Sequence, residues 1–76
     1  MSRPVKRSFT IAGHRTSISL ETAFWDALKE IAVLNNMSIT DLVTGINRDR
    51  RHSNLSSSIR LFVLEYYRTK DRNITG

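Results

Sequence analysis

The sequence contains no cysteine and only three glycines among its 76 residues. Without cysteine, disulfide bonds and thiolate metal sites are excluded. The absence is compatible with a reducing cytoplasm, which is the expected location. No apolar run approaches the roughly 20 residues that a membrane-spanning helix needs, and the first residues make a poor secretion signal. A domain of this size buries a modest fraction of its surface, so oligomerisation is the remaining route to stability.

Residues that carry catalysis or bind metals are also scarce. No nucleophile, base and acid occur in a recognisable set, and the three glycines do not form a phosphate-binding loop. A chain this short rarely encloses a substrate pocket. His14 and His52 lack the clustered spacing of a metal site. We therefore expect neither enzymatic activity nor a metal or other cofactor.

Positive charge is what the sequence has in excess. Twelve Lys and Arg residues against seven Asp and Glu give a net charge of +5, which suits a polyanionic partner such as nucleic acid. No acidic residue precedes Glu21, and a second basic cluster occupies residues 48–52. The first cluster consists of Arg3, Lys6, Arg7, His14 and Arg15.

The first part of the chain alternates between polar and apolar residues. We expect residues 1–7 to form a flexible basic arm and residues 8–76 to form one domain. The segments 8–12 and 15–20 both have the period of a strand. Gly13 between them is compatible with a tight hairpin that turns at Gly13-His14, or with a bend that separates two strands used differently. The pattern leaves both arrangements open.

From Glu21 onward the apolar residues follow a helical period. The first helix is expected to end at Asn35-Asn36, and Ser38 is placed to cap the second helix. A third helix is expected over about residues 54–69. Its apolar face, within residues 55–67, is wider than a small monomer could cover.

A single amphipathic strand is unstable alone, which favours a dimer. In the economical arrangement, residues 15–20 of two chains pair antiparallel, giving a mainly helical fold with a short intermolecular β-ribbon. Thr16, Ile18 and Leu20 would then face the helices, and Arg15, Ser17 and Ser19 would face outward. The expected dimer core consists of Ile18, Leu20, Phe24, Trp25, Leu28, Ile31, Leu42, Val43 and Ile46.

Residues 15–46 combine the pattern Arg-x-polar-Ile-polar-Leu with a helix, the turn Asn36-Met37-Ser38 and a capped second helix. This combination resembles the ribbon-helix-helix fold of Arc-like and methionine-repressor-like DNA-binding proteins, in an extended small bacterial form with an extra C-terminal helix. The resemblance implies that Arg15, Ser17 and Ser19 contact bases in the major groove. It also implies a phosphate contact at the start of the second helix, at Ser38 and Ile39.

We therefore expect a homodimeric, sequence-specific regulator of transcription that acts as a repressor on double-stranded DNA, with further assembly along DNA left open. Phosphate contacts are also expected from Lys6, Arg7, His14, Arg50 and Arg51. The alternative is a protein-interaction module, such as an antitoxin, that binds a partner protein through residues 55–67. No membrane partner is expected.

Overall fold

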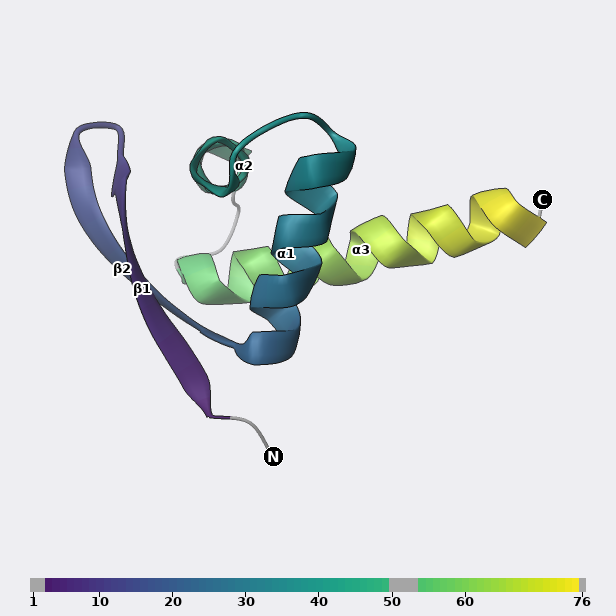
Figure 1. Ribbon diagram of the computed structural model, residues 1–76, viewed down its shortest axis with the longest axis horizontal. Helices are drawn as coiled ribbons and strands as arrows, with labels where there is room; N and C mark the ends of the chain where they lie inside the picture. The colour runs from purple at the N-terminus through teal and green to yellow at the C-terminus, as the bar shows by residue number, and fades with distance from the viewer. Residues whose placement is uncertain (1–2, 50–53, 76) are drawn as a thin grey trace.

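The computed structural model describes residues 3–49 and 54–75, with side chains up to residue 69. Two strands form a ribbon, and all three helices lie on the same side of it (Figure 1). The expected fold class, mainly helical with a short ribbon and a third helix, is confirmed. In chain order the elements are β1 (Pro4–Ile11), β2 (His14–Glu21), α1 (Thr22–Leu34), α2 (Ile39–Asp49) and α3 (Leu55–Thr75).

The ribbon is a hairpin made within one chain. β1 pairs antiparallel with β2 in a register that runs from Pro4 opposite Glu21 to Ile11 opposite His14. The two residues of the turn, Ala12 and Gly13, have φ values of 52° and 81°. Positive φ at both central residues is the signature of a type I′ turn, whose twist matches that of the strands it joins. The hairpin therefore turns at Ala12-Gly13, one residue earlier than Gly13-His14.

Two expectations from the sequence are corrected by this hairpin. Residues 4–7, expected to belong to a flexible arm, form the first half of β1. The ribbon expected between two chains is formed by β1 and β2 of the same chain. The physical reason is that a two-residue turn brings the strands together at little entropic cost, whereas a second chain must also give up translational freedom.

The ends of α1 and α2 follow the capping pattern of the sequence. Asn36, at φ 55°, closes α1 in the left-handed conformation, and the Met37 amide donates to the Ala32 carbonyl at 3.0 Å. The Oγ of Ser38 accepts a hydrogen bond from the amide of Asp41 at 3.0 Å. This bond satisfies one of the free N–H groups at the start of α2 and fixes where that helix begins.

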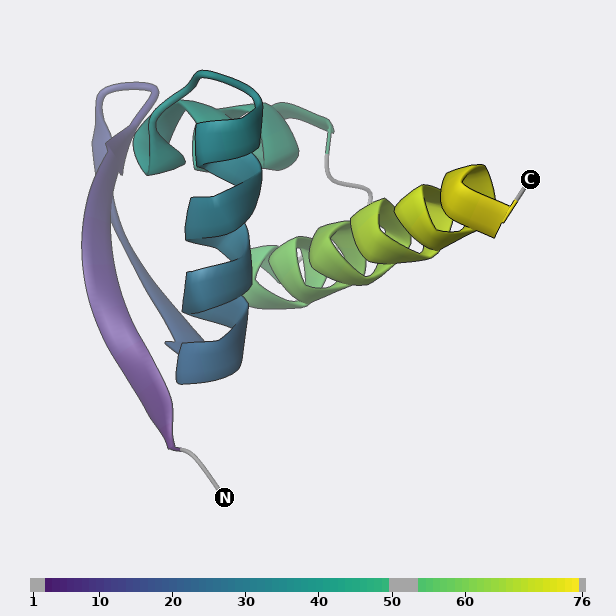
Figure 2. The same cartoon turned by 45° about the vertical axis from the view of Figure 1, so that its right-hand side comes forward.

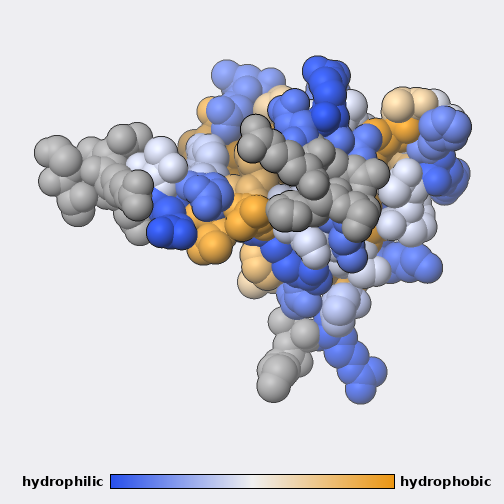
Figure 3. Space-filling model, turned by 180° about the vertical axis from the view of Figure 1, so that it is seen from behind, coloured by the Kyte–Doolittle hydropathy of each residue, from blue (hydrophilic) through white to orange (hydrophobic). Residues whose placement is uncertain are grey.

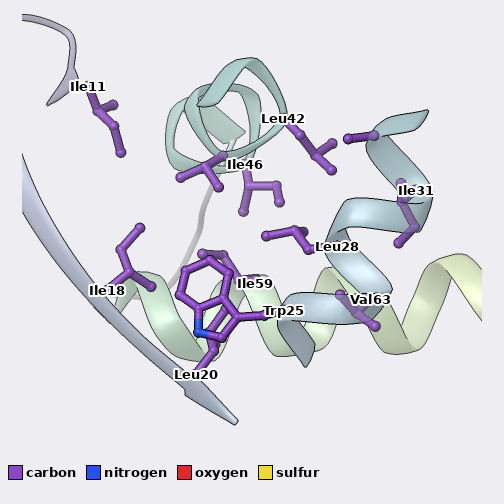
Figure 4. Close-up of a cluster of buried hydrophobic side chains, with 12 residues drawn as sticks. Ile11, Ile18, Leu20, Trp25, Leu28, Ile31, Leu42, Ile46, Ile59 and Val63 are labelled. Atoms are coloured by element: carbon purple, nitrogen blue, oxygen red, sulfur yellow. The ribbon is translucent and has the colours of Figure 1, made fainter. Parts of the chain in front are cut away.

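α3 is part of the core and is longer than expected. It reaches Thr75, beyond the expected end at residue 69, and its C-terminal half extends past α1 (Figure 2). Asn54 caps its start, since its Oδ1 accepts from the Ser57 amide at 3.3 Å. Ile59 and Val63 are buried among side chains of the ribbon, α1 and α2 (Figure 4).

Two polar contacts also attach α3 to the rest of the chain. Arg60 donates two hydrogen bonds to the Glu21 carboxylate, at 3.0 and 3.2 Å, and these bonds hold the pKa of that carboxyl below its usual range. The Tyr67 hydroxyl donates to the Glu30 carboxylate at 3.1 Å. Burial, followed by this hydrogen bond, raises the pKa of the Tyr67 phenol. The position of α3 against α1 is thus fixed at two points, one near each end of α1.

The residues expected in a dimer core form a core within one chain. Of the nine, only Phe24 is half-exposed. The inner face of the hairpin closes this core, because Ile11, Ile18 and Leu20 point from the ribbon toward the helices (Figure 4). The other eight residues of the expected core are buried: Ile18, Leu20, Trp25, Leu28, Ile31, Leu42, Val43 and Ile46.

Two glycines give a matched test of the turn. We expect Gly13→Ala to lower the free energy of unfolding by about 1 kcal/mol, because a Cβ is strained at positive φ. Gly45→Ala should raise it by about 0.5–1 kcal/mol, because Gly45 is helical and its added Cβ would meet no atom within 4 Å. Urea unfolding followed by circular dichroism measures both. Equal effects of the same sign would contradict the turn geometry.

Candidate nucleic-acid interface

One face of the ribbon carries mainly polar side chains and is turned away from the helices. The hairpin register places Lys6 opposite Ser19, Ser8 opposite Ser17, and Thr10 opposite Arg15. Because side chains alternate along a strand, each of these pairs lies on the face opposite to buried Ile18 and Leu20. We call this surface the outer ribbon face. Its members are Lys6, Ser8, Thr10, Arg15, Ser17 and Ser19.

The chemistry of the outer ribbon face is uniform. It combines two cations with four hydroxyl groups, and the next pair in the same alternation, Pro4 opposite Glu21, ends the ribbon with a carboxylate that is bonded to Arg60. Five of the six side chains belong to exposed residues, and Ser19 is half-exposed. The face presents hydrogen-bond donors along its whole length, and its hydroxyls also accept. Such a surface suits an anionic partner that offers a row of acceptors and donors.

The spacing of these side chains is regular because the hairpin is regular. Successive members on one strand are about 6.8 Å apart, which is about two base steps of a DNA strand. Members facing each other across the ribbon have Cβ atoms about 5 Å apart. The outer ribbon face is therefore two parallel rows of three side chains, narrow enough for the major groove of B-DNA.

The opposite side of β1 is held against α1 by Trp25. The indole Nε1 donates to the Val5 carbonyl at 2.9 Å, and the Phe9 ring stacks on the indole with centroids 5.8 Å apart. The guanidinium of Arg7 lies 5.4 Å from the centre of the Trp25 ring, within the range of a cation–π contact. Trp25 thus contacts three residues of β1 and keeps the strand in place.

The start of α2 lies beside β1. Arg7, Trp25 and Ile39 line a shallow hollow between the ribbon, α1 and the first residue of α2. Ser8, Phe9, Asp26 and Lys29 complete its lining. The hollow brings together two positions predicted to contact phosphate, Arg7 and Ile39, and adds the cation of Lys29 and the carboxylate of Asp26.

This arrangement agrees with comparisons to known proteins. The family model described as a ribbon-helix-helix domain matches residues 4–67. The chain belongs to the ribbon-helix-helix family. The family comprises DNA-binding regulators, including antitoxin-type proteins, whose members bind DNA as dimers and whose fold is not an enzyme fold.

A solved structure shows the same fold. An uncharacterized protein from Bordetella pertussis Tohama I is similar to this chain, with a TM-score of 0.79 and 30% sequence identity. The match covers 92% of this chain and 60% of that protein, so this chain spans less than two thirds of its relative's length. A comparison with curated proteins gave no match.

The predicted contact residues of this ribbon-helix-helix domain separate into groups. Arg15, Ser17 and Ser19 share the outer ribbon face with Lys6, for which a phosphate contact is predicted. His14 is exposed beside the turn, opposite Ile11. Ser38 and Ile39 lie at the start of α2. Arg50 and Arg51 lie outside the described residues.

Sequence reasoning did not identify Ser8 and Thr10 as members of the face, nor Lys29 as part of the hollow. For Ser8 and Thr10 a signal exists, since they alternate with Phe9 and Ile11 just before a turn residue. Once a hairpin is assumed, that alternation places both hydroxyls beside Ser17 and Arg15. Lys29 gives no such signal, because its position in the hollow depends on how α1 packs under β1.

Two findings concern other kinds of site. Within residues 3–49 and 54–75, no helix is long and apolar enough to cross a membrane. Over the same part of the chain, no three His, Cys, Asp or Glu side chains come together as metal ligands.

Proposed function

We propose that the protein is a sequence-specific DNA-binding regulator that reads the major groove with the outer ribbon face. The observation that carries the proposal is this face itself: six outward side chains in two rows, with two cations and four hydroxyls. The ribbon-helix-helix family supports DNA as the partner. No residue is assigned a catalytic role.

Within this proposal, Arg15 contributes most to the discrimination between base pairs. Its guanidinium can donate to O6 and N7 of one guanine, and such a bidentate pair distinguishes bases by about 1–3 kcal/mol. Ser17 and Ser19 both donate and accept, so they fit several bases. Lys6, Ser8 and Thr10 would read the neighbouring positions from the second strand of the same hairpin.

Phosphates would be bound at the margins of the ribbon. Ser38 and Ile39 begin α2, where free N–H groups and the helix dipole favour an anion. Arg7 and Ile39 line the hollow beside the start of α2, and Arg7 contributes a guanidinium there. His14 is exposed at the ribbon tip. Arg50 and Arg51 stay predicted phosphate contacts, on sequence grounds alone.

The regulator would bind as a homodimer, as its family does, with each chain contributing its own hairpin. Two copies related by a two-fold axis would read two half-sites of a near-palindromic operator. A protein that occupies such an operator prevents other proteins from binding there, so we propose that the regulator is a repressor. We propose that it acts in the cytoplasm of a bacterium, where that DNA is accessible.

A second candidate function is a protein-interaction module of the antitoxin type. It is favoured by the exposure of Leu61 and Leu64 on α3, which are 43% and 51% exposed. Apolar side chains left at the surface of a small domain in a contiguous patch mark interaction sites. This role is compatible with DNA binding, because α3 lies on the opposite side of the molecule from the outer ribbon face (Figure 1).

The first test removes the discriminating side chain. Arg15→Ala should lower the preference for the selected duplex over unrelated DNA by about 1–3 kcal/mol, since a bidentate base contact is lost. The operator is first found by selection from random duplexes, and affinities are then measured by fluorescence anisotropy. Arg48→Ala, an exposed arginine near the end of α2, is the matched control and should keep the preference. An Arg15→Ala protein with undiminished preference would refute the proposed reading face.

The second test concerns the phosphate contacts. The logarithm of the association constant should fall with the logarithm of salt concentration by about 0.9 per neutralised phosphate. Arg7→Gln should reduce this slope by about one and weaken binding to all duplexes alike, while its remaining stem still covers Trp25. A salt slope near zero for the unaltered protein would show that the basic charge does not bind DNA.

A further inference from the structure

β1 and β2 carry the same short sequence pattern. Residues 6–11 have the sequence KRSFTI, and residues 15–20 have the sequence RTSISL. Each begins with a basic residue, and its last four residues are serine, an apolar residue, a hydroxyl residue and an apolar residue. Only the second position differs in kind, with Arg7 in one copy and Thr16 in the other. The pattern therefore repeats at an offset of nine residues, from Lys6 to Arg15.

The hairpin register turns this repeat into a local two-fold symmetry. In an antiparallel ribbon, an axis perpendicular to the sheet passes between two directly opposite residues and exchanges the strands. Ser8 lies opposite Ser17, and these two residues are also nine positions apart in the sequence. An axis between them therefore carries each residue of the first copy onto its counterpart in the second. Because Ser8 and Ser17 are the middle pair of the outer ribbon face, the whole face is centred on this axis.

The symmetry places the two cations of the face at diagonally opposite corners. Lys6 lies toward the open end of the hairpin on β1, Arg15 lies toward the turn on β2, and both are exposed. They are about 14 Å apart along the ribbon. Alternation alone does not require this order, since the reverse order on one strand would bring both cations to the same end. Figure 3 shows blue and white side chains, hydrophilic or weakly polar, along the edge of the molecule that the ribbon forms. The equivalent pairs are Lys6 with Arg15, Ser8 with Ser17, and Thr10 with Ser19.

The inner face of the hairpin follows the same symmetry. The axis relates Phe9 to Ile18 and Ile11 to Leu20. Ile11, Ile18 and Leu20 are buried in the core, and Phe9 packs against it. Each strand is thus held by two apolar side chains at equivalent positions, so both outer rows are supported in the same way.

Duplex DNA has two-fold axes of its own, which relate its two antiparallel strands. Where a protein with two-fold symmetry binds on such an axis, the sequence that it recognises mirrors that symmetry. With the ribbon axis on a DNA axis, Lys6 and Arg15 would meet equivalent positions on opposite DNA strands. Lysine and arginine share one preferred base, since both donate to O6 and N7 of guanine.

We propose that a single hairpin reads a short inverted repeat, in which Lys6 and Arg15 contact one guanine on each DNA strand. This inference rests on the proposed function and adds Lys6 to the residues that determine specificity, in place of a phosphate contact. The two guanines would lie about four base steps apart. Each half-site of the operator would then be an inverted repeat within itself. The preference is expected to be stronger at Arg15, because its planar guanidinium forms two parallel hydrogen bonds more readily than an ammonium does.

Pairwise changes of protein and duplex test the equivalence of Lys6 and Arg15. In the selected duplex, each of the two guanines is replaced in turn, with the same replacement in every half-site, and affinities are measured by fluorescence anisotropy. Either replacement should weaken binding of the unaltered protein about tenfold. Lys6→Ala should become insensitive to one guanine and stay sensitive to the other, and Arg15→Ala should show the opposite pattern. Lys6→Arg should keep its sensitivity to both guanines.

Arg48→Ala is the matched control and should stay sensitive to both guanines, because this exposed arginine lies on α2. If Lys6→Ala instead weakens binding to all duplexes by one common factor, Lys6 contacts phosphate and the inference is wrong, while the proposed function stands. A selected sequence without an inverted repeat inside each half-site would also overturn the inference alone. Absence of preference for any duplex would overturn the proposed function and this inference together.

Discussion

The structure depends on the packing of an amphipathic ribbon against Trp25 and the helices beneath it. A two-stranded hairpin is marginal in water by itself and needs an apolar surface to cover its inner face. Trp25 supplies part of that surface, with a hydrogen bond to the Val5 carbonyl, a stacked Phe9 ring and the guanidinium of Arg7 above it. Because the inner face is fixed in this way, the outer ribbon face is held as two regular rows.

The third helix makes this packing sufficient within one chain. Ile59 and Val63 fill the space beneath the ribbon and α1, and Arg60 bonds to Glu21 at the junction of β2 and α1. In a chain with only α1 and α2, the apolar side chains of the ribbon and α1 that pack against Ile59 and Val63 would be exposed to solvent. α3 therefore has two distinct faces: one completes the core, and the other, with Leu61 and Leu64, remains exposed.

Much of the fold was predictable because it rests on local rules. The inward Ile18 and Leu20 and the outward Arg15 follow from a period of two, and the cap at Ser38 follows from the residue types at a helix start. Strand pairing is different, since alternation predicts that a segment is a strand but not which segment it pairs with. The sequence favours an intermolecular ribbon because a single amphipathic strand is unstable alone, whereas the turn at Ala12-Gly13 pairs β2 with residues 4–11 of the same chain.

The sequence alone predicts which side of each element is apolar, where α1 ends and α2 begins, and that a basic polar face points away from the core. The tertiary structure decided what lies opposite each face: β1 beside β2, Lys29 and Ile39 in one hollow, and Leu61 next to Phe24. The physical reason is the distance along the chain over which each kind of interaction acts. Periodicity and capping act between residues a few positions apart, whereas strand partners and groove walls are set by packing between segments that the sequence pattern does not connect.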